Sequence, residues 1–265
     1  MGNGMKSLFT NRHPYMFIAP AVLILTVFSL IPIIIAFVIS FTDLDLKGLA
    51  NWSNINFVGI ENYVELLSDE TFHKSLFNTF FYVIIGVPLV IVFSLSIALL
   101  LNYGTSFIFR FFRGVYYMPS ITNIIAVAVV WGYLYNTEYG LFNYLLSLLD
   151  VNKVPWLDEP TIAKLSLILL AVWKGIGINM IIFLAALQGI PKSYYEAAEM
   201  DGANALQKFR HITLPLLTPT TFFVTIMTII SSFQVFDQAF VMTNGGPAKA
   251  SYTIVFHIYD QAFVD

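Results

Sequence analysis

The chain has 265 residues, of which 58% are hydrophobic and only 11% are charged, whereas a soluble globular domain carries about 25% charged residues. A net charge of −3 and the lack of any Lys/Arg cluster exclude a nucleic-acid-binding surface. Because cysteine is absent, disulfides, thiol nucleophiles and cysteine metal sites are excluded as well. We therefore expect an all-α integral membrane protein, surrounded by lipid and stabilised by helix packing.

Long, nearly uncharged runs predict five membrane spans, because about 20 apolar residues cross the hydrocarbon core of a bilayer. The first run is longer than the apolar core of a signal peptide, so we predict that this span is retained. Prolines inside the runs predict kinked helices, which neighbouring helices in a membrane tolerate. The predicted spans are residues 15–41, 76–101, 114–135, 162–187 and 212–236.

Two loops of modest length lie on the same side of the predicted bundle. Residues 43–74 contain an amphipathic pattern that predicts a helix of about two turns on the membrane surface. Its apolar residues are Ile60, Tyr63, Val64, Leu67 and Phe72. We interpret this helix as a packing lid, and direct contact with substrate is the alternative. The second loop, residues 136–161, has Trp156 near the expected interface.

The basic residues are distributed unequally between the two sides of the predicted bundle. Seven Lys and Arg residues share the side of the N-terminus and four lie on the other side. Because cytoplasmic segments carry the excess of Lys and Arg, the N-terminus and residues 190–213 are predicted to be cytoplasmic. The seven are Lys6, Arg12, Arg110, Arg113, Lys192, Lys208 and Arg210, and the four are Lys47, Lys74, Lys153 and Lys249.

The cytoplasmic segment 190–213 carries signals for a short helix. Pro191 interrupts the preceding span, and Ser193 followed by Glu196 predicts a capping box at a new helix start. Gly202 can supply a positive φ angle or a tight helix C-cap. These helix signals fit an ordinary amphipathic loop helix as well as a helix that docks on another protein.

Several motifs resemble the permease subunits of binding-protein-dependent ABC importers of the maltose and multiple-sugar type. The resemblance extends from about residue 15 to the end. Its strength is the agreement of spacing, order and topology. The motifs are E-A-A at Glu196, Ala197 and Ala198 with Gly202 four positions on, I-x-L-P at Ile212 to Pro215, FLAALQGIP at 183–191, TNGGP at 243–247, FVGIENY at 57–63, and the pair Asn78-Thr79.

The resemblance implies a type I importer permease bundle that carries a sugar or oligosaccharide across the cytoplasmic membrane of a bacterium or archaeon. It also implies a second permease subunit in a heterodimer, two ATPase subunits and an extracytoplasmic solute-binding protein. A separate ATPase would contact the loop at Glu196, Ala197, Ala198, Asp201 and Gly202. The family has a sixth span, which would follow the outer segment 237–265.

This chain itself is not expected to be an enzyme or to hold a cofactor. It contains no Gly-Lys dipeptide, which a P-loop requires, so ATP and Mg²⁺ would bind to the partner ATPase. It also lacks H-E-x-x-H and G-x-S-x-G, and its four histidines are scattered over the loops. A glycerol-phosphate importer permease and an ion-coupled secondary transporter remain the alternative functions.

Polar residues at membrane depth are costly and are therefore candidates for the substrate path. Two segments contain them, on the spans 162–187 and 212–236 and just beyond. Lys174 can instead pair within the bundle, and the serines can bond to their own helix; a lysine there is not expected from the family pattern. The candidates are Gln234, Asp237, Ser231, Ser232, Asn179, Lys174 and Trp173, with Gln238, Phe233 and Phe236 beside them.

Overall fold

The computed structural model describes residues 13–44 and 55–264, which form two compact units, residues 1–69 and 70–265. Within the described residues nearly every element is a helix, and β pairing is limited to an isolated bridge between Thr42 and Phe57. The all-α prediction is confirmed. Three basic residues that entered the charge count, Lys6, Arg12 and Lys47, lie outside the described residues.

The first unit begins with a long helical segment built from α2 (His13–Leu25), η1 (Thr26–Leu30) and α3 (Ile31–Ile39). The π-type turn η1 lies just before Pro32, and the Ile31 N–H donates to the Thr26 carbonyl five residues back. Proline lacks an N–H and its ring crowds the carbonyl four positions earlier. A wider turn at this position lets the helix continue past the proline.

The FVGIENY motif ties the end of α3 to the short helix α4 (Glu61–Ser68). The Asn62 side chain donates to the carbonyls of Ser40 and Thr42, at 3.0 and 2.8 Å. The Tyr63 hydroxyl lies 2.7 Å from the Ser40 hydroxyl. The predicted two-turn helix is therefore present, although Phe72 belongs to the next helix, α5. Its role as a packing lid stays a prediction.

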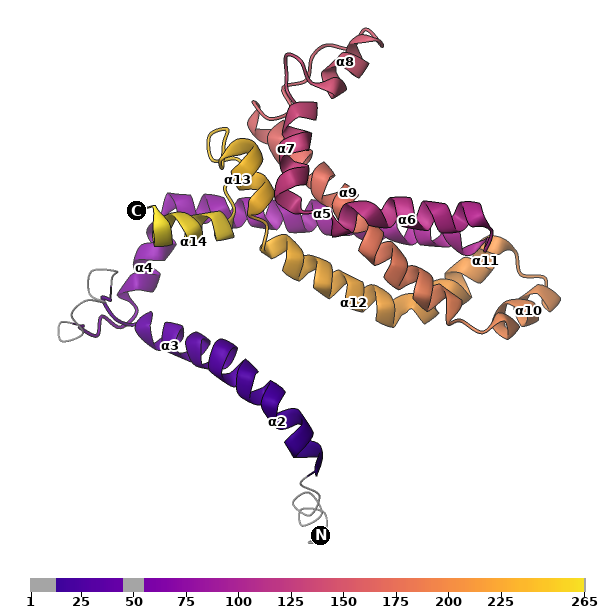
Figure 1. The fold of residues 1–265 in the computed structure, drawn as a ribbon, viewed down its shortest axis with the longest axis horizontal. Coiled ribbons are helices and arrows are strands. Elements are labelled where there is room, and N and C mark those ends of the chain that lie inside the picture. Colours follow the sequence, from indigo (N-terminus) through magenta and orange to yellow (C-terminus); the bar gives the residue numbers. More distant parts are fainter. Residues whose placement is uncertain (1–12, 45–54, 265) are drawn as a thin grey trace. The chain divides into compact units, whose positions relative to one another are not determined.

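Four helices run alongside one another in the second unit (Figure 1): α5 (Glu70–Asn102), α6 (Phe107–Ile121), α9 (Pro160–Gln188) and α12 (Leu214–Phe233). Helix α9 is central: like α5 it contacts all three of the others, and it is the more buried of the two. Two apolar clusters surround it, one containing Leu167 and Val172 and the other containing Met180 and Phe183. The most buried helix of the unit is thus the one that carries Lys174 and Asn179.

The predicted span 114–135 is two helices rather than one. Helix α6 and the following α7 (Ile124–Leu134) meet at an angle of 99°. Thr122 has an extended ψ angle of 144° and ends α6, and the Asn123 side chain caps α7 by accepting from Ile125 and Ala126. The chain therefore leaves α6 at Thr122 and starts α7 at Asn123, whose side-chain oxygen accepts from N–H groups that would otherwise lack an acceptor. This break is much sharper than the proline kink that the sequence predicted.

The loop between α7 and α9 contains the short helix α8 (Leu141–Ser147) and is held together by one buried asparagine. The Asn143 side chain donates to the Thr137 and Val154 carbonyls and accepts from the Trp156 indole at 3.0 Å. At the start of α9, backbone N–H groups, chiefly that of Ile162, donate to Glu159 and lower the pKa of its carboxyl.

The predicted span 212–236 begins earlier in the structure. Helix α11 (Ala205–Lys208), the π-type segment η4 (Phe209–Thr213) and α12 form one run from Ala205 to Phe233. As in η1, the π-type turn lies just before a proline, here Pro215, whose missing N–H it accommodates. Four helices among the described residues are long and apolar enough to span a membrane, or five with the bent pair α6–α7.

The C-terminal part of the described chain folds back onto α5. Helices α13 (Asp237–Thr243) and α14 (Ile254–Phe263) are joined by the loop that contains TNGGP. Asn78 on α5 donates to the carbonyls of Lys249 and Tyr252, both at 2.9 Å. The Thr79 hydroxyl accepts from the Ile254 N–H at 3.0 Å. The pair Asn78-Thr79 therefore binds the chain just after the TNGGP motif, far away in the sequence.

We predict that Asn78→Ala destabilises the protein by about 2 kcal/mol, because the carbonyls of Lys249 and Tyr252 each lose the donor that ties them to α5. The measurement is thermal unfolding of the purified chain in detergent, followed by circular dichroism. The control is Asn102→Ala, which removes an exposed asparagine from the same helix. Equal melting curves for both variants would show that Asn78 does not hold this loop.

Candidate functional site

The segment with the E-A-A motif forms the helix α10 (Lys192–Met200), which lies at one end of the second unit with α11 (Figure 1). The predicted capping box at Ser193 is wrong. Pro191 is the N-cap residue, with an extended ψ of 132°, so Ser193 already lies inside the first turn. A capping box is present instead at Asn204 and Gln207, where it starts α11.

Gly202 ends α10 in the left-handed conformation that the sequence suggested, with φ at 77°. Its N–H donates to the Glu199 carbonyl at 3.0 Å, and the Ala203 N–H donates to the Ala198 carbonyl at 2.9 Å. These two bonds satisfy the last carbonyls of the helix and form a Schellman motif. Only glycine adopts this φ angle without a steric cost.

One face of α10 is fixed to the protein and the other is open. The Tyr195 hydroxyl lies 3.0 Å from the Thr213 hydroxyl, and Lys208 forms an ion pair with Glu199 at 2.5 Å. Ala198 is half-buried on the fixed side. The other predicted contact residues are exposed: Glu196, Ala197, Asp201 and Gly202.

The sequence analysis missed the apolar residues at this exposed end. The side chain of Met200 is 89% exposed and that of Leu206 is 72% exposed. Met200 is the last residue of α10 and Leu206 lies in α11, and exposure to water is unfavourable for both side chains. The available signal was an apolar residue between charges, such as Met200 between Glu199 and Asp201.

A cavity of about 550 Å³, with an apolar wall that carries several polar side chains, lies among α5, α9, α12 and the two helix breaks of the second unit. Its wall includes Phe236 and Gln238 as well as six of the seven predicted substrate-path residues. The six are Lys174, Asn179, Ser231, Ser232, Gln234 and Asp237. The structure thus brings together side chains from two segments that the sequence analysis had treated separately. Their contact with a substrate stays a prediction.

Trp173 is the predicted residue that does not line this cavity. Its ring packs against Trp131 on α7, with 5.3 Å between the ring centres. Phe233 likewise packs against Phe80 on α5, at 5.6 Å. Trp173 precedes Lys174 by one position on the helix, which turns the indole away from the side of α9 that faces the cavity.

Two interrupted helices supply most of the polar wall. Ser120 and Ile124 line the cavity from the α6–α7 break, and residues 234–238 line it from the break between α12 and α13. Interrupted helices expose backbone groups, which are tolerated at membrane depth only where the protein or a water-filled cavity satisfies them. Discontinuous helices of this kind form substrate sites in many transporters.

Lys174 binds the end of α6. Its ammonium donates to the carbonyls of Pro119, Ser120 and Thr122, at 3.1, 3.5 and 2.5 Å. A cation is favourable at a helix C-terminus because unsatisfied carbonyls carry partial negative charge there. These contacts pair Lys174 within the bundle, which is the alternative that the sequence analysis gave for this residue.

Ser120 is a site residue that the sequence analysis missed. Its hydroxyl donates to the Lys174 carbonyl at 2.7 Å and accepts from the Ile178 N–H at 3.1 Å. These are the two backbone groups that an α-helix would pair with each other, so Ser120 is inserted into the hydrogen-bond ladder of α9. The available signal was a polar residue after Pro119 inside an apolar run.

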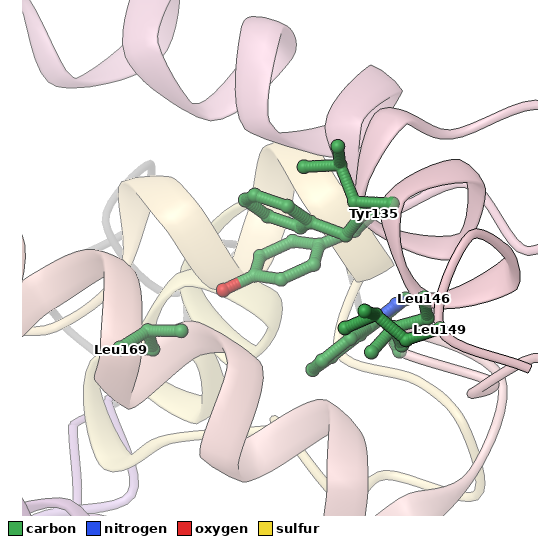
Figure 2. A pocket seen from close by; sticks show the side chains of 7 residues that line it. Tyr135, Leu146, Leu149 and Leu169 are labelled. Atoms are coloured by element: carbon green, nitrogen blue, oxygen red, sulfur yellow. The ribbon is translucent and has the colours of Figure 1, made fainter. Parts of the chain in front are cut away.

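A second, smaller cavity of about 270 Å³ lies between α8 and the outer part of α9 (Figure 2). Its lining is apolar, and the Tyr135 hydroxyl donates to the Ser166 carbonyl at 2.8 Å. The indole of Trp156 is likewise bound, to Asn143. A sugar needs several free polar partners, so this cavity does not suit one. The residues that line it are Tyr135, Phe142, Leu145, Leu146, Leu149, Trp156 and Leu169.

Comparison with known proteins decides the family. Residues 67–255 match the family described as "Binding-protein-dependent transport system inner membrane component". The chain belongs to this family. It is therefore a permease subunit of an ABC transporter in the inner membrane.

Two relatives from Bacillus subtilis (strain 168) match this permease along almost its whole length. The "Probable ABC transporter permease protein YesP" is 39% identical, covering 99% of this chain and 86% of the relative. The "Arabinooligosaccharides transport system permease protein AraP" is 35% identical, covering 98% of this chain and 82% of the relative.

A solved structure shares the fold of this permease. It is the crystal structure of a bacterial ABC transporter involved in the import of the acidic polysaccharide alginate. The TM-score is 0.78 at 23% identity, covering 98% of this chain and 87% of that chain. The predicted importer permease bundle is confirmed by this match.

We predict that Gly177→Ala disturbs the contact between α6 and α9. A Cβ atom at Gly177 would lie 2.2 Å from the Tyr116 carbonyl oxygen and 2.8 Å from the Tyr117 Cα, so α6 must move. The control is Gly114→Ala on α6, where a Cβ meets nothing within 4 Å. Gly177→Ala is expected to lower the melting temperature and the yield of monodisperse protein in detergent, and Gly114→Ala to leave both unchanged. Equal behaviour of the two variants would contradict the close packing.

Proposed function

We propose that this permease forms one half of the path through which an ATP-driven importer carries a sugar or oligosaccharide. The group of polar side chains on the wall of the 550 Å³ cavity is the observation that carries the proposal. Amide and carboxylate groups from Asn179, Gln234 and Asp237 can bind sugar hydroxyls, and the ring of Phe236 offers an apolar face to a sugar ring. The oligosaccharide named for AraP supports this substrate class.

The loop at the other end of the unit suits contact with an ATPase. Helix α10 is short, fixed on one side by Tyr195 and Glu199, and open at Glu196 and Ala197. Because α11, η4 and α12 form one helical run from Ala205 to Phe233, a push on this loop is transmitted along α12 to the cavity wall. Closure of an ATPase would in this way change access to the cavity.

The remaining partners follow from this assignment. A second permease subunit would complete the pore, two ATPase subunits would hydrolyse ATP with Mg²⁺, and a solute-binding protein would deliver the sugar. The N-terminus and α10 would face the cytoplasm, which agrees with the excess of Lys and Arg on that side.

The substrate prediction is tested with the importer purified together with its partners and reconstituted in liposomes. Radiolabelled arabinotriose, maltose, lactose and glycerol 3-phosphate are supplied with the binding protein outside and ATP inside. We expect ATP-dependent uptake of a sugar, lowered about tenfold by Gln234→Ala through the loss of polar contacts to it. Trp173→Phe, outside the cavity, is the control. Uptake of glycerol 3-phosphate alone, or uptake driven by an ion gradient without ATPase, would contradict the proposal.

The coupling prediction concerns the open face of α10. Ala197→Trp is expected to lower co-purification of the ATPase and ATP-dependent uptake by about tenfold or more, because the indole blocks close approach of another protein. Thr105→Trp, an exposed residue in the α5–α6 turn, is the matched control. Both variants should reach the membrane in equal amounts. Normal uptake with Ala197→Trp would rule out docking at this face.

A further inference from the structure

Lys174 is an unusual residue for its position. It lies in the middle of α9, the most buried spanning helix, and a charge at membrane depth is costly unless it is paired. Its Nζ atom has three backbone carbonyls within hydrogen-bonding reach, all from Pro119 to Thr122. An ammonium has three donors, so these carbonyls can take all of them.

The carbonyls at this helix end can use such a donor. Helix α6 ends at Ile121, and the chain turns by 99° into α7, so the last carbonyls of α6 lack the N–H groups of a continuing helix. The Pro119 carbonyl accepts instead from the Thr122 N–H, at 3.3 Å. The Asn123 side chain satisfies N–H groups of α7, which leaves the other side of the break to Lys174. Lys174 and Asn123 thus complete the two helix ends of one break.

Ser120 and Gly177 join the same break to α9. The Ser120 hydroxyl binds the Lys174 carbonyl and the Ile178 N–H, and the lack of a side chain at Gly177 lets the α6 backbone come close. The ammonium and the backbone of Lys174 are therefore both bound to the final turn of α6. Because Ser120 and Ile124 line the cavity, a shift of this turn moves the cavity wall.

We propose that Lys174 is a positioning residue for transport, whose charge holds the end of α6 at the cavity wall and is not available to bind substrate. Among the described residues that line the cavity, Lys174 and Asp237 are the charged ones. With Lys174 committed to carbonyls, this chain presents a carboxylate and no free cation to a ligand. The wall therefore suits a neutral sugar better than a phosphate or a uronic acid. The link to transport rests on the proposed function, whereas the structural role does not.

The structural role is tested by spin labelling of the full chain in nanodiscs. The chain contains no cysteine, so Ile121→Cys, at a residue 67% exposed, gives a single label at the end of α6. In Lys174→Met we expect the rotational correlation time of this label to fall by about twofold or more, because the helix end loosens. A label at Phe107→Cys, at the other end of α6, should not change.

Two further variants make the result specific. Lys164→Met removes the other lysine of α9, whose ammonium lies over the Phe81 ring at 4.8 Å, and should leave the Ile121 label unchanged. Lys174→Arg keeps a cation and should restore the parent spectrum, also if Lys174→Met proves too unstable to purify. An unchanged label in Lys174→Met, or a loosened label in Lys174→Arg equal to that in Lys174→Met, overturns the proposal.

Uptake separates positioning from substrate recognition. In the reconstituted importer, Lys174→Met should lower the maximal rate for each substrate that the parent carries, by about tenfold through misplacement of the wall, and leave the ratio between arabinotriose and glycerol 3-phosphate unchanged. A selective loss of glycerol 3-phosphate would show that Lys174 reads the substrate. If the parent carries no sugar at all, the proposed function fails, and the label at Ile121 still decides the role of Lys174.

Discussion

The break between α6 and α7 sets the requirement that the rest of the second unit meets. A chain that turns by 99° inside an apolar region leaves backbone carbonyls and N–H groups without partners, and lipid cannot supply them. Lys174 donates to the carbonyls, Asn123 accepts from the N–H groups, and Ser120 enters the ladder of α9. Helix α9 must be central and close to α6 for these contacts, which Gly177 permits.

The same arrangement connects the two ends of the unit. The helical run from Ala205 to Phe233 begins beside α10 and ends at the break before α13, where Gln234 and Asp237 line the cavity. At that end, Asn78 and Thr79 on α5 hold the loop between α13 and α14 by three hydrogen bonds. A displacement of α10 therefore acts on a cavity whose opposite wall is fixed to α5 and α9.

The charged side chains of the permease have different kinds of partner at the exposed loop and within the spans. At the exposed loop, Glu199 and Lys208 form an ion pair that fixes one side of α10, where solvent screening keeps the contribution small. Within the spans, Lys164 lies over aromatic rings and Lys174 binds carbonyls. Both lysines have partners that carry no formal charge, which is how a helix bundle accommodates cations without buried acids.

Much of this molecule was readable from sequence, because membrane spans are apolar runs of fixed minimum length and the positive φ angle of Gly202 is one that glycine adopts at the lowest cost. The helix type, the spans around α5 and α9, and the loop with the E-A-A motif were predicted in this way. The start of α10 was predicted wrongly, because the pattern assigned the N-cap position to Ser193 and the structure has Pro191 there. The angle at Asn123, the partners of Lys174 and the meeting of Asn78 with the TNGGP loop were decided only in three dimensions. The last two depend on hydrogen bonds between segments far apart in the chain, which local sequence patterns do not encode, and the angle at Asn123 depends also on how α6 packs against α9.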